Sequence, residues 1–278
     1  RIMGGNPAER CRSEAPCFAE NASSSVISMG FYSIPCVRSS YSMPEASVSE
    51  SLSSARERLR AALSAADRPN DAARLLAVSK TKPADMLRQA YMAGQRAFGE
   101  NYLQEALEKQ QALADLDDIE WHFIGALQSN KTRDVAEHFS WVHGVDREKI
   151  ARRLSEQRPA ELGAINVCLQ LNVSGESSKS GVDLAALPAL AESLLSLPNL
   201  RLRGLMALPA PSDDPQQQRH AFRQVADALA ELQRRFPDAP LDTLSMGMSN
   251  DLEAAVLEGA TIVRLGTAIF GSRPPFRS

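Results

Sequence analysis

The sequence predicts a (β/α)8 barrel, an α/β fold in which eight parallel strands alternate with helices, with one extra helix at its N-terminal end. Short apolar, β-branched runs alternate with longer amphipathic stretches beyond residue 70. Residues 43–278 approach the roughly 250 residues typical of this fold. The rival fold is an open doubly wound sheet. It more often has a glycine-rich fingerprint after its first strand, whereas the first strand here runs into residues 80–83, KTKP.

The first predicted element is a helix over 45–67, where leucines recur with alanines between them and no proline intervenes before Pro69. Strands are predicted over 75–81, 96–99, 120–125, 141–145, 166–173, 202–208, 243–248 and 261–270. Helices are predicted over 83–93, 102–116, 131–139, 147–157, 184–197, 215–236 and 251–258. Pro83 suits the first turn of a helix, and Gly94 and Gly259 suit helix ends.

Composition and charge exclude several classes of protein. The chain is 44% hydrophobic and 23% charged, as ordinary globular proteins are. Its net charge of −3 argues against a nucleic-acid-binding protein that relies on bulk positive charge. It lacks an apolar run long enough for a transmembrane helix, and we expect a cytoplasmic protein. Its 4 cysteines show no metal-ligand spacing, so neither a zinc site nor a disulfide framework is expected.

Residues 1–42 differ from the rest of the chain, because they are rich in serine and show no helical or strand periodicity. Their glutamates fit neither a secretory signal nor an organellar transit peptide. We interpret 1–42 as a disordered extension or an artefact of the recorded start site, with Met43 as the natural start. Residues 43–278 would then form a single barrel domain.

Lys80 ends the first predicted strand, at the edge where a barrel of this type builds its active site. It shares a face with Leu76 and Val78, so it should point from the barrel interior at its mouth. Partial burial disfavours the charged ammonium, and a neutral amine is the form that attacks an aldehyde to make a Schiff base. The alternative is a lysine that extends into solvent at the strand end.

Residues 245–249, SMGMS, end the seventh predicted strand and precede a helix. Gly247 would let the backbone approach a ligand, and hydroxyl groups and helix N–H groups could hold a phosphate. Gly266 and Thr267 would lie beside them, since phosphate sites in this fold often use the loops after strands 7 and 8. The alternative is a capping box that begins at Asn250.

Arg264 alternates onto the inward face of the eighth predicted strand, where its charge cannot be neutralised and needs a partner. That partner could be a carboxylate such as Glu100 or the ring nitrogen of a bound heterocycle. His122 could act as a base, or it could be a hydrogen-bonded lining residue. Cys168 is interpreted as a small core residue.

Six segments in the same order along the chain carry a family resemblance. They are LAVSKTKP (76–83), FGENY (98–102), WHFIG (121–125), LQSNK (127–131), SMGMS (245–249) and RLGTAIFG (264–271). Through them the chain closely resembles the pyridoxal phosphate homeostasis protein family over residues 45–273. One departure is Ala126, where the family commonly has proline.

The resemblance implies a barrel similar to the N-terminal domain of alanine racemase, of fold type III. It also implies a Schiff base between pyridoxal 5′-phosphate (PLP) and Lys80. An arginine near the pyridine nitrogen would weaken the cofactor as an electron sink. The cofactor-binding residues implied besides Lys80 are Ser245, Gly247, Ser249, Gly266 and Thr267 around the phosphate, Arg264 near the ring nitrogen, Asn101 and His122 along the ring, Met206, and Lys179 as a secondary lysine.

Enzymes that resemble this barrel add a β-domain and complete their active sites across a dimer, and we expect no such domain here. We therefore expect a monomer that stores, buffers or delivers PLP without catalysis, with apo forms of PLP-dependent enzymes as candidate recipients. No nucleic acid, membrane or metal ion is expected to take part. Two alternatives stay open: a racemase-like PLP enzyme acting on small amino acids, and a Schiff-base aldolase that needs no cofactor.

Overall fold

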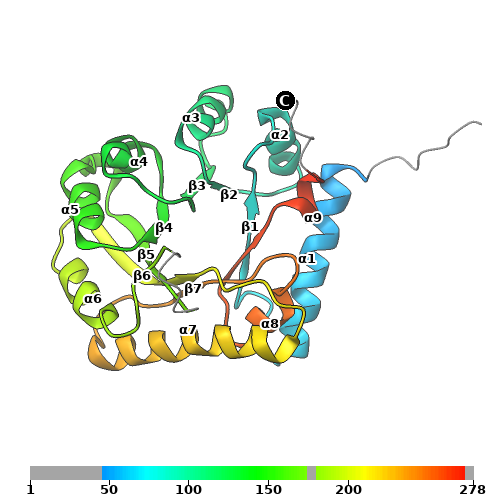
Figure 1. The fold of residues 1–278 in the computed structure, drawn as a ribbon. Helices are drawn as coiled ribbons and strands as arrows, with labels where there is room; N and C mark the ends of the chain where they lie inside the picture. Colours follow the sequence, from blue (N-terminus) through cyan, green and yellow to red (C-terminus); the bar gives the residue numbers. More distant parts are fainter. Residues whose placement is uncertain (1–45, 174–179, 273–278) are drawn as a thin grey trace, which may run out of the picture. The chain divides into compact units, whose positions relative to one another are not determined.

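Eight parallel strands close into one barrel in sequence order, and β8 pairs with β1 (Figure 1). The computed structural model describes residues 46–173 and 180–272. The predicted (β/α)8 barrel with an extra helix at its N-terminal end is therefore confirmed. The predictions for residues 1–42, for Met43 as the start and for Lys179 concern residues outside the described part of the chain.

Each strand begins within two residues of where the sequence pattern places it. The strands are β1 (Arg74–Val78), β2 (Ala97–Glu100), β3 (Glu120–Phe123), β4 (Trp141–Val145), β5 (Ile165–Leu171), β6 (Leu200–Ala207), β7 (Thr243–Ser245) and β8 (Ile262–Leu265). The helices are α1 (Val48–Ala65), α2 (Ala84–Met92), α3 (Leu103–Ala112), α4 (Thr132–His138), α5 (Glu148–Gln157), α6 (Leu187–Leu195), α7 (Pro215–Arg235), α8 (Leu252–Leu257) and α9 (Thr267–Phe270). Short 3-10 turns lie at Ser129–Lys131 and Ala160–Leu162. Within 46–173 and 180–272, no helix combines the length and apolar content needed to cross a membrane.

The end of the eighth predicted strand is the main error in the element assignment. The strand stops at Leu265, Gly266 leaves the extended conformation, and α9 follows. Residues 267–270 form a short, mostly apolar run, and periodicity alone does not distinguish such a run in a strand from one in a buried helix.

The extra helix α1 covers the outside of the barrel beside α2, α8 and α9 (Figure 1). Its N-terminus is closed by a capping box, in which Ser47 and Glu50 exchange hydrogen bonds. Its buried face carries Leu52, Leu59 and Leu63. Because α9 has only 4 residues, α1 supplies the apolar surface that a full eighth outer helix would otherwise provide.

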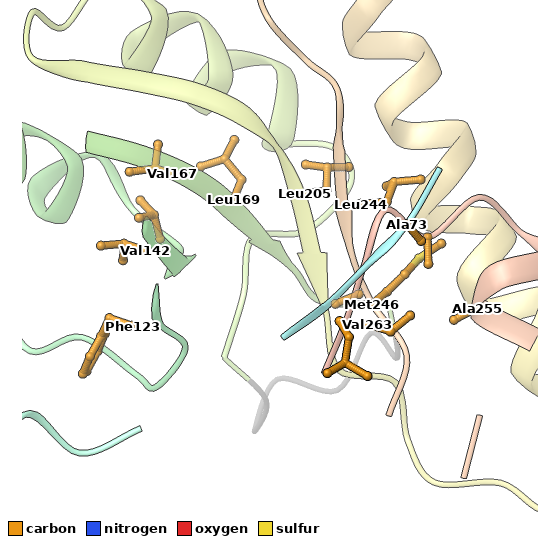
Figure 2. Packing of buried hydrophobic residues seen from close by; sticks show 14 of the residues in the cluster. Ala73, Phe123, Val142, Val167, Leu169, Leu205, Leu244, Met246, Ala255 and Val263 are labelled. Carbon is orange, nitrogen blue, oxygen red and sulfur yellow. The ribbon is translucent and has the colours of Figure 1, made fainter. Parts of the chain in front are cut away.

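Two apolar layers line the strands. Figure 2 shows part of the outer layer, in which Val142, Val167 and Leu205 point from their strands towards the surrounding helices. The inner layer is small and consists of Leu76, Ala97, Trp141, Cys168, Met206 and Ile262. Cys168 is fully buried, which confirms it as a core residue, and burial raises the pKa of its thiol to about 12.

The barrel interior also holds polar side chains, although layers of branched aliphatic residues usually fill it. His122, His143, Ser245 and Arg264 are all buried there. Polar groups in such a place must find hydrogen-bond partners, because burying them unpaired is costly.

We expect Gly204→Ala to lower the free energy of unfolding by about 3 kcal/mol or more. Gly204 has φ +154, and an added Cβ would lie 1.9 Å from the Thr243 carbonyl oxygen of β7. Gly163→Ala is the matched control, because Gly163 has φ +65 with no atom within 4 Å of an added Cβ. It should cost about 1 kcal/mol, from backbone strain alone. Urea unfolding measures both losses, and equal losses would contradict the close approach of β6 and β7 as the reason for the glycine.

Candidate functional site

A cavity of about 630 Å³ lies at the end of the barrel where the strands finish. Its lining includes Lys80, Asn101, Met206, Ser249, Arg264, Gly266 and Thr267, which the sequence predicted. It also includes Val78, Ile124, Leu208, Met248, Asn250 and Ala268, which were not predicted to bind a cofactor. The structure does not bring His122, Ser245 or Gly247 to this lining. Lys179 lies outside the described residues.

Lys80 follows β1 on the face that strand alternation predicted. Leu76 packs in the inner apolar layer and Val78 lines the cavity, so the inward positions of β1 lead directly to Lys80. Lys80 itself is partly buried and lines the same cavity. The strand β1 pairs with β8 where the barrel closes, and in this pairing Leu76 lies opposite Arg264.

Hydrogen bonds hold the residues on both sides of Lys80. The Ser79 hydroxyl donates to Glu100 Oε1 at 2.6 Å, and the Thr81 N–H donates to Glu105 Oε1 at 2.5 Å. Thr81 has φ +64, a left-handed conformation that is uncommon for a β-branched residue. The bond to Glu105 holds the backbone in this conformation, and with it the direction in which Lys80 leaves the strand.

Lys109 joins these contacts into one buried cluster outside the barrel wall. Its Nζ donates to Glu100 Oε1 at 2.7 Å, to Glu105 Oε1 at 2.6 Å and to the Ser79 carbonyl oxygen at 2.7 Å. Burial raises the pKa of the Glu100 carboxyl, and Lys109 opposes that effect. The prediction that Glu100 could be the partner of Arg264 is wrong, because β2 turns Glu100 outward to Lys109.

Arg264 is 4% exposed and is held by neutral groups. Its Nη1 donates to the Ser245 carbonyl oxygen at 2.6 Å and to Ser245 Oγ at 2.8 Å, and its Nη2 donates to the Ala207 carbonyl oxygen at 2.9 Å. Burial lowers its pKa to about 10, so the guanidinium stays protonated at neutral pH. Two of its five N–H donors have no partner in the described part of the chain, and Arg264 lines the cavity.

The loop after β7 is shaped by its contacts with the helices around it. Gly247 has φ +95, and an added Cβ would lie 2.6 Å from Ala255 Cβ of α8. Packing against α8 therefore requires the glycine, and the predicted approach of its backbone to a ligand stays a prediction. Arg58 of α1 donates to the Ser249 carbonyl oxygen at 2.8 Å and fixes the loop from outside.

The capping box predicted at Asn250 does not form. The helix α8 begins at Leu252, and the Asp251 side chain accepts a hydrogen bond from the Met248 N–H at 2.6 Å. Glu253, which would close the box, pairs with Arg58 instead. The position of Ser249 at the cavity therefore depends on contacts from distant parts of the chain.

Two histidines, His122 and His143, lie inside the barrel, and the sequence pattern indicated only His122. His122 Nδ1 lies 2.8 Å from His143 Nε2, and His122 Nε2 lies 2.5 Å from Glu120 Oε1. His143 Nδ1 lies 2.7 Å from Ser245 Oγ. Burial lowers the pKa of both imidazoles. The sequence could have indicated His143, because it lies two residues after the inward-facing Trp141 on β4 and therefore shares its face.

Asn101 carries a further indication of a ligand. Its Oδ1 is buried without a hydrogen-bond partner in the structure of 46–173 and 180–272, and Asn101 lines the cavity. An unsatisfied buried polar atom is costly, so a group in the cavity that donates a hydrogen bond would satisfy it.

Comparisons with known proteins agree with this arrangement. The model of the family described as alanine racemase, N-terminal domain, matches residues 51–274. A protein named pyridoxal phosphate homeostasis protein from Pseudomonas aeruginosa is 60% identical over 226 residues, which cover 81% of this chain and 96% of that protein. Its namesake from Escherichia coli K12 is 52% identical over 228 residues, covering 81% and 97%.

Solved structures extend the comparison. PipY of Synechococcus elongatus with PLP bound has a TM-score of 0.72 and 40% identity, covering 81% of this chain and 100% of PipY. Alanine racemase from Corynebacterium glutamicum is 20% identical with a TM-score of 0.58, covering 82% and 63%, and it supports the fold alone. The resemblance seen in the sequence is confirmed: the chain belongs to the pyridoxal phosphate homeostasis protein family, which shares the alanine racemase N-terminal domain.

Proposed function

We propose that this chain binds PLP in the cavity at the strand ends and holds it as a reserve for other proteins, without catalysis. The observation that carries the proposal is the meeting of Lys80, Arg264 and the unpartnered Asn101 Oδ1 in one cavity of about 630 Å³. The names of the relatives at 60% and 52% identity and the PLP bound to PipY support it.

The described lining residues match the chemistry of PLP. When bound, PLP supplies an aldehyde, and Lys80 Nζ would form a C=N bond to its carbon while the aldehyde oxygen leaves as water. Lys80 is the only primary amine among the described lining residues. The hydroxyls of Ser249 and Thr267 offer hydrogen bonds to a phosphate, and Asn101 Oδ1 offers an acceptor.

Arg264 would face the ring nitrogen of PLP with the donors that Ser245 and Ala207 leave unused. A guanidinium can only donate hydrogen bonds, so it would keep that nitrogen as an unprotonated acceptor. An unprotonated ring nitrogen makes PLP a weaker electron sink. This arrangement suits a protein that holds PLP more than one that uses it for amino-acid chemistry.

The cavity offers few groups for proton transfer. Among its described lining residues, Lys80 and Arg264 are the ionisable ones, and a pKa of about 10 keeps Arg264 protonated at neutral pH. Racemisation and related reactions need a positioned acid and base besides the amine that holds the cofactor. We therefore favour a reserve over a racemase-like enzyme, with apo forms of PLP-dependent enzymes as recipients.

Lys80→Ala should abolish covalent PLP attachment. Borohydride reduction of the wild-type protein with PLP, followed by peptide mass mapping, should place the cofactor on Lys80. Lys82→Ala is the matched control, since Lys82 Nζ donates to the Ser272 carbonyl oxygen and is not part of the cavity lining. It should retain attachment. A wild-type protein labelled mainly on another lysine, or not at all, would refute the assignment of Lys80.

Glu105→Ala should weaken PLP binding roughly tenfold, because a hydrogen bond to a charged group contributes about 1.5–3 kcal/mol. The substitution removes the acceptor that holds Thr81 and one partner of Lys109, so the segment carrying Lys80 loses its support. The control is Glu108→Ala on the same helix, where the exposed Glu108 accepts only from Gln104 in the described structure. Equilibrium dialysis measures both affinities. Equal affinities in the two variants would contradict a role for Glu105 in positioning Lys80.

The PLP-loaded protein should show no racemisation, decarboxylation or transamination across a panel of amino acids. It should instead restore activity to an apo enzyme mixed with it, as the cofactor leaves Lys80 for the recipient. Chiral chromatography and a coupled activity assay measure these two outcomes. Robust turnover of any amino acid would contradict the proposed role as a PLP reserve and would favour the racemase-like alternative.

A further inference from the structure

A continuous chain of hydrogen bonds crosses the barrel from one mouth to the other. It begins beside a second cavity of about 400 Å³, whose lining includes Arg74, Glu120 and Trp141. Arg74 Nη1 donates to Glu120 Oε1 at 2.6 Å. The chain continues from Glu120 Oε1 to His122 at 2.5 Å, from His122 to His143 at 2.8 Å, and from His143 to Ser245 Oγ at 2.7 Å. Ser245 Oγ lies 2.8 Å from Nη1 of Arg264, which lines the cavity proposed for PLP.

The donors and acceptors fix the direction of this chain. Arg264 can only donate, so the Ser245 hydroxyl accepts from it and has its own proton free for His143 Nδ1. His143 then carries its proton on Nε2 and donates to His122 Nδ1. His122 likewise donates from Nε2 to the Glu120 carboxylate. This arrangement gives each hydroxyl and imidazole proton in the chain an acceptor.

Burial favours neutral imidazoles in this chain, whereas the Glu120 carboxylate raises the pKa of His122. Burial lowers the pKa of His122 and takes that of His143 well below its ordinary range, and Arg74 lowers both. Arg264 and His122 lower the pKa of His143 further. At the open end, burial would raise the pKa of Glu120, but His122 and Arg74 bring it down to about 2. Glu120 is thus a carboxylate that accepts from both neighbours.

The remaining neighbours of the histidines do not supply a competing proton. Trp141 stacks on His122 with an interplanar angle of 7°, and the guanidinium groups of Arg74 and Arg203 lie over its ring. Arg203 pairs with Asp242 at 2.6 Å. The Cys168 thiol stays protonated at neutral pH, because burial raises its pKa to about 12.

We propose that His143 is a positioning residue for Arg264, and that His122 and Glu120 fix its tautomer from the opposite mouth of the barrel. The proposal rests on the proposed function, because Arg264 is the residue that would face the PLP ring. If His122 gained a proton, its Nδ1–H would point at His143 Nε2 and drive the His143 proton to Nδ1. The Ser245 hydroxyl proton would then lose its acceptor in the chain, and the hydrogen bonds that position Arg264 would weaken.

The tautomers can be read in the protein without PLP. Nitrogen-15 NMR of the imidazoles should show His122 and His143 with the proton on Nε2 at pH 7, and the His143 signal should stay unchanged down to pH 5.5. The exposed His138 and His220, removed one at a time as His→Gln variants, assign the other two signals. A His143 signal with the proton on Nδ1, or one that titrates near 6.5, would overturn the proposal.

Stability adds a second measurement without PLP. The folded-state pKa of both buried histidines lies below the unfolded value near 6.5, so they stabilise the fold above that pH and lose this contribution as pH falls below it. The unfolding equilibrium constant should rise by up to about tenfold per pH unit for each histidine. This dependence should shrink in His143→Leu, and an unchanged dependence would contradict neutral burial of His143.

PLP affinity tests the positioning role itself. His143→Leu and Glu120→Leu should each weaken PLP binding at least tenfold at pH 7.5, although neither residue lines the PLP cavity. Glu120→Gln keeps an acceptor oxygen for His122 and should restore most of the affinity lost in Glu120→Leu. His220→Gln, on the exposed face of α7, is the control and should bind as the wild type does.

The outcomes separate the two proposals. Wild-type protein that binds no PLP would refute the proposed function, while the NMR tautomers would still test the chain. Wild-type binding with unchanged affinity in the folded His143→Leu and Glu120→Leu variants would refute the positioning role alone. If His143→Leu does not fold, Glu120→Leu at the open end and the wild-type NMR measurement decide the question.

Discussion

The charge of Arg264 inside the barrel is the constraint on which the site depends. Its guanidinium is buried and remains protonated at neutral pH, while its hydrogen-bond partners are two carbonyl oxygens and one hydroxyl. These dipoles, together with the charge of the Asp251 carboxylate, must therefore compensate a cation that burial opposes. Ser245 supplies two of these dipoles and in turn needs a partner for its own proton, which His143 provides. One buried arginine thus accounts for a polar interior where a barrel normally packs aliphatic side chains.

The two groups proposed to face the ligand, Lys80 and Arg264, are supported from opposite sides of the barrel wall. The segment carrying Lys80 is held from outside by Lys109 and its glutamates, whereas Arg264 is held from inside by the chain through Ser245. The pairing of β8 with β1, with Leu76 opposite Arg264, brings both groups to the same mouth. Because each support uses its own residues, a change in one leaves the other intact, and the two can be varied separately.

Alternation along single strands placed Lys80 and Arg264 on inward faces, and the repeated strand–helix pattern predicted the eight-stranded barrel. Asn101 and Met206 were predicted only through the family resemblance. Alternation did not reveal three contacts: the ion pair of Glu100 with Lys109, the hydrogen bond between His143 and Ser245, and the packing of Gly247 against Ala255. Those contacts join residues far apart in the chain, and they depend on the register and stagger with which the sheet closes. A single sequence shows which face of a strand a side chain occupies more directly than it shows which residues of other strands and helices that side chain contacts.

The same arginine that makes the interior polar also limits the chemistry at the cavity. A permanent hydrogen-bond donor beside a ring nitrogen opposes protonation of that nitrogen, and an unprotonated ring draws electrons from an attached substrate less strongly. The described lining adds Lys80 as its only other ionisable side chain, so proton transfer would depend on the amine that is proposed to hold the aldehyde. A site built in this way would retain a reactive aldehyde while giving it little to react with, which is the property that the proposed reserve of PLP requires.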